Sequence, residues 1–392
     1  MRSCAVSFQY RLLYPAIMSD GTSWVAARSK RMGSVAKKFG VLVCLSGLAV
    51  GCASAIPESR PRPVERPVPP PRPIVLRPNP PQAQPPSGLD DAIRDQWRAF
   101  PGKTGVAVTN VETGWTIGQR VGEYFPQQSV SKTWVAMTVL DLVDQGKMRL
   151  DQRVRITPAD LAVFHQPIRD RVLASGEIEE SVLSLLEQAI TASDNSANDA
   201  LLRTAGGPDA VRAFITKRNL GAIRFGPGER LLQSGIAGLE WQQPYSVGRR
   251  FYSARDALPF DRRKAALDRY LADPVDGASP SAIVSGLSRL AKGELLSASS
   301  TRLLLGIMGR VRSGPNRLKA GVPLGWGFVH KTGTGQELPP VSTGYNDIGI
   351  MTAPDGTRYA VAVMISDTTA SIPARMAFMQ SISRTVAAYH RQ

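Results

Sequence analysis

Two periods of apolar residues alternate along the chain, and they predict strands near both ends of a globular region. Residues 104–120 alternate apolar and polar side chains on either side of a Thr-Gly turn, which predicts two β-strands. The helical spacing of residues 89–100 predicts a helix before them, and a closing helix is predicted from about Ile372 to His390. Further strands are predicted at 326–333, 345–353 and 358–367.

Between these two groups of strands the pattern is helical. Segments with the 3.6-residue period are 181–192, 196–206, 208–219, 281–293 and 298–311. Strands at both ends of a helical middle predict an α/β fold of the α+β sandwich kind. In this fold the two ends of the globular region form one sheet, and an all-helical subdomain is inserted between them.

One predicted helix contains a residue that does not fit its surroundings. The helix that begins within "FPQQSVSKTW", residues 125–134, is apolar on nearly all sides through Val143, which predicts burial. Lys132 nevertheless lies in its first turn. A buried ammonium without a partner is strongly destabilising, so Lys132 needs either a partner or a chemical task.

The first 52 residues are predicted to be a secretory signal. Residues 1–31 are either an unusually long n-region or precede the true start at Met32, and we favour the second interpretation. Two lysines after Met32 precede the apolar stretch Val41–Val50, which is too short to span a bilayer as a mature helix. Two cleavage sites compete. One makes Cys52 the acylated first residue of a lipoprotein, and the other is an ordinary signal-peptidase site at Ala53-Ser54-Ala55.

A proline-rich segment, residues 53–88, follows the signal. It has 13 prolines in the 30 residues from Pro57 to Pro86, so it cannot pack a core and would extend by ~3.1 Å per residue. Such a tether is most useful with an anchor, which favours lipidation of Cys52. We expect a periplasmic lipoprotein held at a membrane, and a soluble periplasmic form is the alternative.

Charge and cysteine content exclude several classes of function. The formal net charge is +16, but residues 1–87 carry 12 Lys and Arg against 3 Asp and Glu, which leaves 36 against 29 for the rest. No basic run interleaved with aromatics occurs there, so we expect no nucleic-acid partner. The cysteines are Cys4, Cys44 and Cys52, and no histidine stands at metal-ligand spacing. We therefore expect no internal disulfide, no metal and no cofactor.

Ser129 and Lys132 form the motif S-x-x-K. Three residues apart on a helix, they share one face. Burial lowers the pKa of a lysine, and a neutral amine can accept the proton of a serine hydroxyl and activate it as a nucleophile. The motif alone is weak evidence, because Ser34 to Lys37 also matches it, but that copy lies in the leader.

Two further motifs strengthen this interpretation. Ser193-Asp194-Asn195 follows a helix that is predicted to end at about Ala192, and Lys331-Thr332-Gly333 lies at the end of a predicted strand. A second K-T-G at 103–105 precedes the serine and leads into the first strand. The motifs S-x-x-K, S-D-N and K-T-G in this order are typical of class A β-lactamases and penicillin-binding proteins.

Residues 89–390 resemble class A β-lactamases over essentially their whole length. Residues 125–151 are similar to the nucleophile helix of that family, and residues 206–233 are similar to the stretch that leads into its omega loop. Glu229, 36 residues after Ser193, stands where the family has a general-base glutamate in E-x-x-L-N, with Gln233 in place of the asparagine. The resemblance implies an antiparallel sheet, flanked by helices, in a catalytic domain of residues 89–392.

The resemblance also implies roles for individual residues. Ser129 would attack the lactam carbonyl, and its backbone N–H and that of Thr334 would bind the oxyanion. Ser193 would protonate the leaving nitrogen, and Arg317 in "RLKAGVP" stands where some members bind the substrate carboxylate. The implied catalytic residues are Ser129, Lys132, Ser193 and Glu229. The implied substrate-binding residues are Asn195, Lys331, Thr332, Gly333, Thr334, Arg317, Gln233 and an aromatic gatekeeper, Phe164.

These observations predict a monomeric serine β-lactamase that acts on small-molecule penicillins and cephalosporins. A D,D-peptidase or related peptidoglycan hydrolase, or a sensor that stays acylated, remains an alternative. Glu229 favours the lactamase because only deacylation needs a dedicated base, and Glu240 is a weaker rival for that role. Residues from about 234 to 279 are predicted to be an insertion, which either forms a wall of the site or lies only on the surface. A Ser-His-Asp hydrolase is disfavoured because no G-x-S-x-G occurs.

Overall fold

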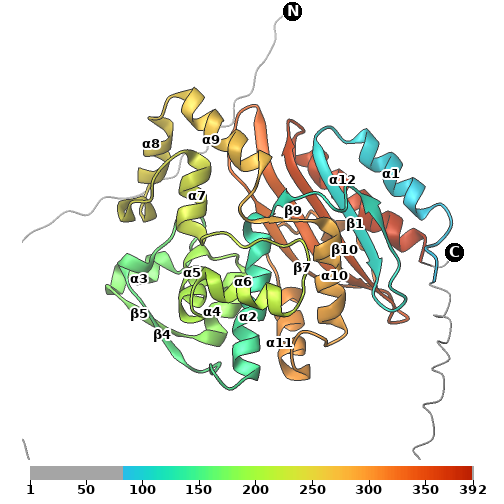
Figure 1. Cartoon of the computed structure of the whole chain (residues 1–392), viewed down its shortest axis with the longest axis horizontal. Coiled ribbons are helices and arrows are strands. Elements are labelled where there is room, and N and C mark those ends of the chain that lie inside the picture. Colours follow the sequence, from blue (N-terminus) through green and yellow to red (C-terminus); the bar gives the residue numbers. More distant parts are fainter. Residues whose placement is uncertain (1–82, 391–392) are drawn as a thin grey trace, which may run out of the picture. The chain divides into compact units, whose positions relative to one another are not determined.

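A computed structural model describes residues 83–390 of the chain (Figure 1). The signal segment, the cleavage sites and nearly all of the proline-rich tether lie outside the described residues. The predictions made for them are therefore taken up as proposals below.

One antiparallel sheet is built from both ends of the described region (Figure 1). Its strand order is β2-β1-β10-β9-β7, with β8 paired to β9, and β7 forms an edge. The strands are β1 (Lys103–Asn110), β2 (Thr116–Gln119), β7 (Gly327–Thr334), β8 (Glu337–Leu338), β9 (Val341–Thr352) and β10 (Arg358–Thr368). The predicted fold class and the predicted strands are thereby confirmed.

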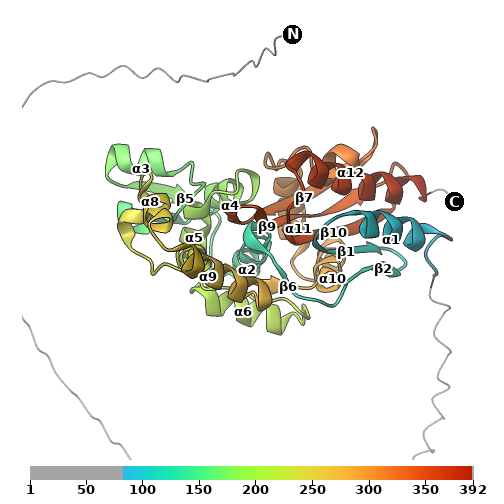
Figure 2. The same ribbon diagram turned by 90° about the horizontal axis from the view of Figure 1, so that it is seen from above.

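The two faces of the sheet bury different cores because side chains alternate along each strand. Val106 and Val363 lie in a core beneath the terminal helices α1 (Leu89–Ala99) and α12 (Ile372–Ala388). Ala107 and Ala362, their neighbours in the register, lie in the larger core of the opposite face. Figure 2 shows α1 and α12 on one side of the sheet and α10 (Pro280–Ala291) on the other.

The helical subdomain lies between β2 and β7 in the chain and beside the sheet in space (Figure 1). Its central helix α2 (Lys132–Asp144) is buried from Lys132 to Asp141, as its apolar sequence predicts. The helices around it are α4 (Val182–Thr191), α5 (Asn195–Thr204), α6 (Pro208–Lys217) and α11 (Ala298–Gly309). The sequence prediction of an all-helical subdomain is wrong in one detail. The subdomain also holds a hairpin of β4 (Arg153–Ile156) and β5 (Ile178–Ser181), with α3 (Arg169–Ser175) between them.

Residues 234–279, which the sequence analysis predicts to be an insertion and which keep that name below, form a set of short helices beside the subdomain. It continues α7 (Glu229–Ala237) and contains α8 (Arg250–Asp256) and α9 (Phe260–Ala272). It ends at β6 (Gly277–Ala278), which pairs with β3 (Phe125–Pro126). The turn Gln128–Ser131 follows β3 and carries Ser129, so it is called the nucleophile turn after the role predicted for that serine. This pairing joins the insertion to the segment that carries Ser129.

Candidate active site

Most of the predicted site residues line a cavity of about 260 Å³ at the junction of the sheet and the helical subdomain. Lys132, Lys331 and Gly333 lie behind this lining, in contact with residues that form it. The edge strand β7 forms one wall, and the nucleophile turn, α5 and α7 supply the others. Two larger hollows, of 440 and 640 Å³, contain none of the predicted residues. The cavity is lined by Ser129, Phe164, His165, Ala192, Ser193, Asn195, Glu229, Gln233, Ser313, Arg317, Thr332 and Thr334.

Lys132 has the partners that its burial demands. Its ammonium group donates to Ser129 Oγ at 2.8 Å and to Asn195 Oδ1 at 2.9 Å, and it forms a buried ion pair with the carboxylate of Glu229. A 3₁₀ turn over Gln128–Ser131 joins directly onto α2, so Ser129 and Lys132 share one face as the motif spacing predicts. Three acceptors for three N–H groups explain how an ammonium is tolerated here.

Glu229 is the first residue of α7, a helix that was not among those predicted from the sequence. A carboxylate in the first turn is favoured by the helix dipole. Gln233, one turn later, donates from Nε2 to Glu229 Oε2 at 3.3 Å. The backbone N–H of Glu229 donates to Asp199 Oδ1 at 3.2 Å. Burial, with the charge of Glu229, raises the pKa of Asp199 to about 6.

Asp199 is a contact that the sequence analysis missed. It lies four residues after Asn195 on α5, and a four-residue spacing places both on one helix face. That spacing was the available signal.

The S-D-N turn is held in place by Asp194. Its carboxylate caps α5 by accepting from Ala197 N at 2.9 Å and also accepts from Ile168 N at 2.7 Å. Ser193 takes a left-handed backbone conformation, with φ of 59°, which turns its side chain toward β7. There Ser193 Oγ accepts from Lys331 Nζ at 2.9 Å.

Lys331 is a second buried lysine, and its surroundings differ from those of Lys132. Burial lowers the pKa of Lys331 well below its ordinary value, and the nearby charges of Lys132 and Arg317 add to this effect. Its Nζ also donates to the carbonyl oxygen of Thr332 at 2.9 Å. Because its pKa is lowered, Lys331 gives up a proton more readily than an exposed lysine does.

Gly333 allows the edge strand to approach the nucleophile turn. A Cβ added to it would lie 2.4 Å from the carbonyl oxygen of Gln127, so no other residue fits without a backbone shift. Asn346 on β9 fastens the same turn by donating to the carbonyl oxygens of Pro126 at 2.7 Å and Gln127 at 3.1 Å.

Arg317 gives the β7 end of the cavity its positive charge. It donates to Gly333 O at 2.8 Å and to Thr334 Oγ1 at 2.5 Å, and its guanidinium lies 3.8 Å from the ring centroid of Tyr345. Burial lowers the pKa of Arg317, but a guanidinium stays charged in proteins. Ser313, which the sequence analysis also missed, places its Oγ 2.6 Å from Thr332 Oγ1.

Phe164 stands at the cavity wall, and the insertion supports it. Its ring packs edge-to-face on Phe251 of α8, with centroids 4.9 Å apart, and lies 5.7 Å from the ring of Tyr252. Glu240, by contrast, is exposed in the loop after α7 and does not line the cavity. The structure therefore brings Glu229, and not Glu240, to the cavity that Ser129 also lines.

His330 lies outside this constellation. Its Nδ1 is 2.9 Å from Asp347 Oδ1 in the interior of the sheet, where both side chains are buried. Among residues 83–390, no three His, Cys, Asp or Glu side chains are grouped so that they could bind a metal ion.

Asp276 supports the nucleophile turn from behind. It accepts from the backbone N–H of Gln128 at 2.8 Å and from the hydroxyl of Tyr270 at 2.9 Å. Burial raises the pKa of Asp276 to about 6, and the charge of Glu229 contributes to this. The folded protein therefore binds the Asp276 proton more tightly than the unfolded chain does.

This shift predicts a pH-dependent cost for Asp276→Asn. The raised pKa stabilises the wild type fully below about pH 4, and this contribution is lost as pH rises through about 6. The variant lacks that contribution, so its cost in unfolding free energy should be about 2 kcal/mol smaller at pH 7.5 than at pH 4.5. Urea denaturation of both proteins at the two pH values measures it. An equal loss of unfolding free energy at both pH values would contradict the raised pKa of Asp276.

Comparison with known proteins identifies the class to which this fold belongs. An ancestral class A β-lactamase of solved structure matches with a TM-score of 0.59 and 30% identity, over 76% of this chain and 99% of that one. The extended-spectrum β-lactamase PER-1 of Pseudomonas aeruginosa is 29% identical over 264 residues, which are 67% of this chain and 74% of PER-1. β-Lactamase VEB-1 of the same species is 26% identical over 276 residues, which are 70% of this chain and 81% of VEB-1.

Residues 88–390 match the sequence profile of the β-lactamase enzyme family, and the chain belongs to that family. The resemblance to class A β-lactamases is thereby confirmed.

Proposed function

We propose that the protein hydrolyses the amide bond of β-lactams through an acyl-enzyme on Ser129. The observation that carries this proposal is the position of Lys132, which contacts the Ser129 hydroxyl and the Glu229 carboxylate at once. One residue thus links a nucleophile to a second acid-base group, and the two half-reactions of an acyl-enzyme hydrolase need these two groups.

Acylation uses Lys132 as a neutral amine, which faces Ser129 Oγ. As Ser129 Oγ bonds to the lactam carbonyl carbon, its proton passes to Lys132. Backbone N–H groups of Ser129 and Thr334 bind the oxyanion, a stabilisation that typically contributes more than any other single term. Ser193, which accepts a hydrogen bond from Lys331, then gives its proton to the lactam nitrogen as the C–N bond breaks. The proton taken up by Lys132 passes on to Ser193, so Glu229 remains a carboxylate for deacylation.

Deacylation needs a base that removes a proton from water, and we assign this role to Glu229. Its carboxylate lies in the cavity wall within reach of the acylated serine. Gln233, in place of the asparagine of the family motif, donates to Glu229 and is itself held by Gln336 Nε2, which lies 3.1 Å from Gln233 Oε1. Gln233 thus serves to orient the base.

The substrate carboxylate would bind at the β7 end of the cavity. This end is lined by Thr332, Thr334 and the guanidinium of Arg317. Behind them Lys331 adds a further N–H donor in either protonation state. At the opposite end Asn195, whose Oδ1 accepts from Lys132, would hold the side-chain amide of the antibiotic. Phe164, supported by Phe251 of the insertion, would form the wall beside that side chain.

A comparison of substrates tests the function. The purified protein is incubated in parallel with benzylpenicillin and with a peptide that ends in D-Ala-D-Ala, and both products are measured by mass spectrometry. Steady hydrolysis of the penicillin without cleavage of the peptide supports the proposal. Cleavage of the peptide, with the penicillin acting only as an inhibitor, would assign the protein to the D,D-peptidases instead.

We further propose that the catalytic domain is tethered in the periplasm. The arguments are the sequence features of residues 1–88: a start at Met32, an acylated Cys52 and a proline-rich segment that keeps the domain away from the anchor. No helix within residues 83–390 has the length and apolar character needed to cross a membrane. Acyl chains on Cys52 would supply about 0.8 kcal/mol for each buried CH₂ group.

Cys52→Ala should therefore move the protein from the membrane fraction to the soluble fraction. The measurement is immunoblotting of fractionated cells that express the full chain. Cys44→Ala serves as the matched control, because it removes a cysteine of the same leader and should leave the distribution unchanged. Retention of Cys52→Ala in the membrane fraction would reject the lipoprotein and favour another form of attachment.

A further inference from the structure

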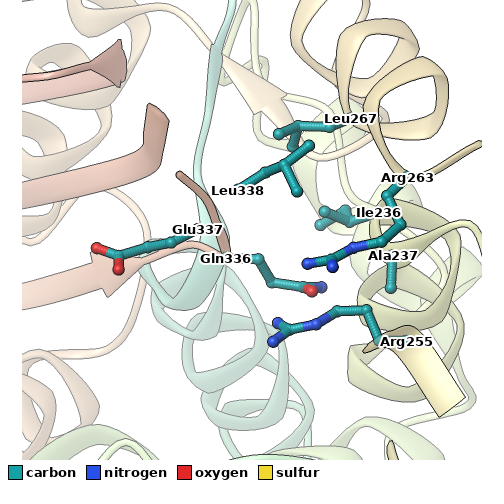
Figure 3. Close-up of a pocket in the computed structure, with 8 residues that line it drawn as sticks. All are labelled: Ile236, Ala237, Arg255, Arg263, Leu267, Gln336, Glu337 and Leu338. Atoms are coloured by element: carbon teal, nitrogen blue, oxygen red, sulfur yellow. The ribbon is translucent and has the colours of Figure 1, made fainter. Parts of the chain in front are cut away.

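The insertion packs directly against the elements that carry the proposed base. Leu267 of α9 meets Ile236 of α7 and Leu338 of β8 in one apolar cluster (Figure 3). Gln336 points into the same space, where Arg255 and Arg263 face it from the insertion (Figure 3). Tyr270, on the last turns of α9, belongs to this cluster and is buried. The insertion is thus a wall of the catalytic domain and reaches its interior.

From Tyr270 a series of hydrogen bonds leads to Glu229. Gln128 Nε2 donates to the Tyr270 hydroxyl at 2.6 Å, and Gln233 Nε2 donates to Gln128 Oε1 at 2.9 Å. The same Gln233 nitrogen lies 3.3 Å from Glu229 Oε2. Two glutamine side chains therefore connect a phenol of the insertion to the carboxylate that we propose as base.

The directions of these bonds are consistent with one another. Burial, together with the neighbouring Asp276, raises the pKa of Tyr270 well above its ordinary value, so the phenol keeps its proton. It can then donate only to Asp276 and must accept from Gln128, which fixes the orientation of the Gln128 amide. Gln336 fixes the Gln233 amide in the same way by donating to its oxygen. A fully satisfied buried network of this kind holds its members in one arrangement.

We propose that Tyr270 is a positioning residue for deacylation, which acts through Gln128 and Gln233 to hold the Glu229 carboxylate against the attacking water. This inference rests on the proposed function and deepens it, because it gives the insertion a part in the reaction. Tyr270 touches neither the nucleophile nor the cavity lining, so its effect is indirect.

The network predicts that the two half-reactions respond differently. Loss of the Tyr270 hydroxyl leaves the bond from Gln128 N to Asp276 in place, so the turn that carries Ser129 keeps its support. Lys132 keeps its contacts with Ser129 and Asn195 as well. The Gln128 amide, however, loses the acceptor that orients it, and through Gln233 the carboxylate of Glu229 becomes less well placed. Small errors in position are costly in catalysis.

Tyr270→Phe tests the proposal, since it removes one oxygen and keeps the ring in its apolar cluster. We expect deacylation to slow about tenfold, which corresponds to one net hydrogen bond, with acylation changed less than about twofold. Both kcat and KM should then fall, while kcat/KM stays close to that of the wild type. Stopped-flow hydrolysis and quenched-flow mass spectrometry of the adduct separate the two rates.

The matched control is Tyr359→Phe. Tyr359 is also buried, and its hydroxyl lies 2.9 Å from His390 Nδ1 in the core beneath the terminal helices. This variant loses a comparable hydrogen bond and should keep both rates. A purely structural role of Tyr270 would instead lower the fraction of active enzyme and leave kcat per active site unchanged, which would overturn the proposal.

A double variant gives a second test that does not depend on absolute rates. If Tyr270 acts through Gln233, adding Tyr270→Phe to Gln233→Leu should slow deacylation no further. Additive losses would contradict the proposal.

If the wild type itself forms no acyl-enzyme, the proposed function fails. If the wild type turns over and Tyr270→Phe deacylates at the same rate, only the role of Tyr270 fails.

Discussion

Replacement of Glu229 by Gln should give an enzyme that reacts once with a penicillin and then stops. The amide keeps the shape of the side chain but cannot take a proton from water, whereas Ser129 and Lys132 retain the contact needed for attack. Loss of a general base typically costs 10²–10⁴-fold, so deacylation should become slow enough to trap the intermediate. Mass spectrometry should find the mass of the intact drug added to a peptide that contains Ser129.

Glu240→Gln is the matched control for this experiment. Glu240 lies close to Glu229 in the sequence, but it is exposed and does not line the cavity. The control should hydrolyse penicillin at the wild-type rate. Normal turnover by Glu229→Gln, together with an adduct trapped by Glu240→Gln, would transfer the role of base to Glu240.

Replacement of Ser129 by Ala should abolish both the adduct and the hydrolysis. No other hydroxyl is hydrogen-bonded to Lys132 Nζ among the described residues, so nothing near it can take over as nucleophile. Removal of the serine nucleophile from an unrelated hydrolase lowers kcat on the order of 10⁶-fold, and a loss of that order is expected here. Intact-mass spectra after incubation with penicillin should show only the unmodified variant.

Ser131→Ala provides the comparison. Ser131 lies in the same turn, but its hydroxyl donates to the carbonyl oxygen of Gln128 at 2.7 Å and does not line the cavity. This variant should still form the adduct. An adduct on Ser129→Ala would show that another residue is the nucleophile and would remove the basis of the mechanism.

Short-range patterns allowed the fold to be predicted from the sequence to a large extent. The alternation of residues in β1, β9 and β10 and the helical periods around α2 depend on neighbours a few positions away, and the structure follows them. The hairpin of β4 and β5 was missed because its strands have four residues each and offer too few apolar positions to form a pattern. The helix α7 that begins at Glu229 was missed as well, because its nine residues are too few for a clear helical period.

The candidate site shows the same division between local and distant signals. Motifs of three or four residues pointed to Ser129, Ser193 and Lys331, and the structure brings all three to one cavity or its wall. Their roles remain predictions. The contacts that link Gln128 to Tyr270 and Asp276 join residues 142 and 148 positions apart, and no pattern in a single sequence encodes such a pairing. Side-chain packing around the insertion creates it.

The number of turnovers per active site tests the central claim most directly. Active-site concentration is first determined from the amount of penicillin adduct formed by Glu229→Gln. Wild-type protein at that concentration is then mixed with excess chromogenic cephalosporin, and the absorbance change is followed. The account predicts continuous hydrolysis of many equivalents per site, with free enzyme recovered at the end. Release of a single equivalent, followed by a persistent adduct on the wild type, would contradict it and identify a sensor or a peptidase.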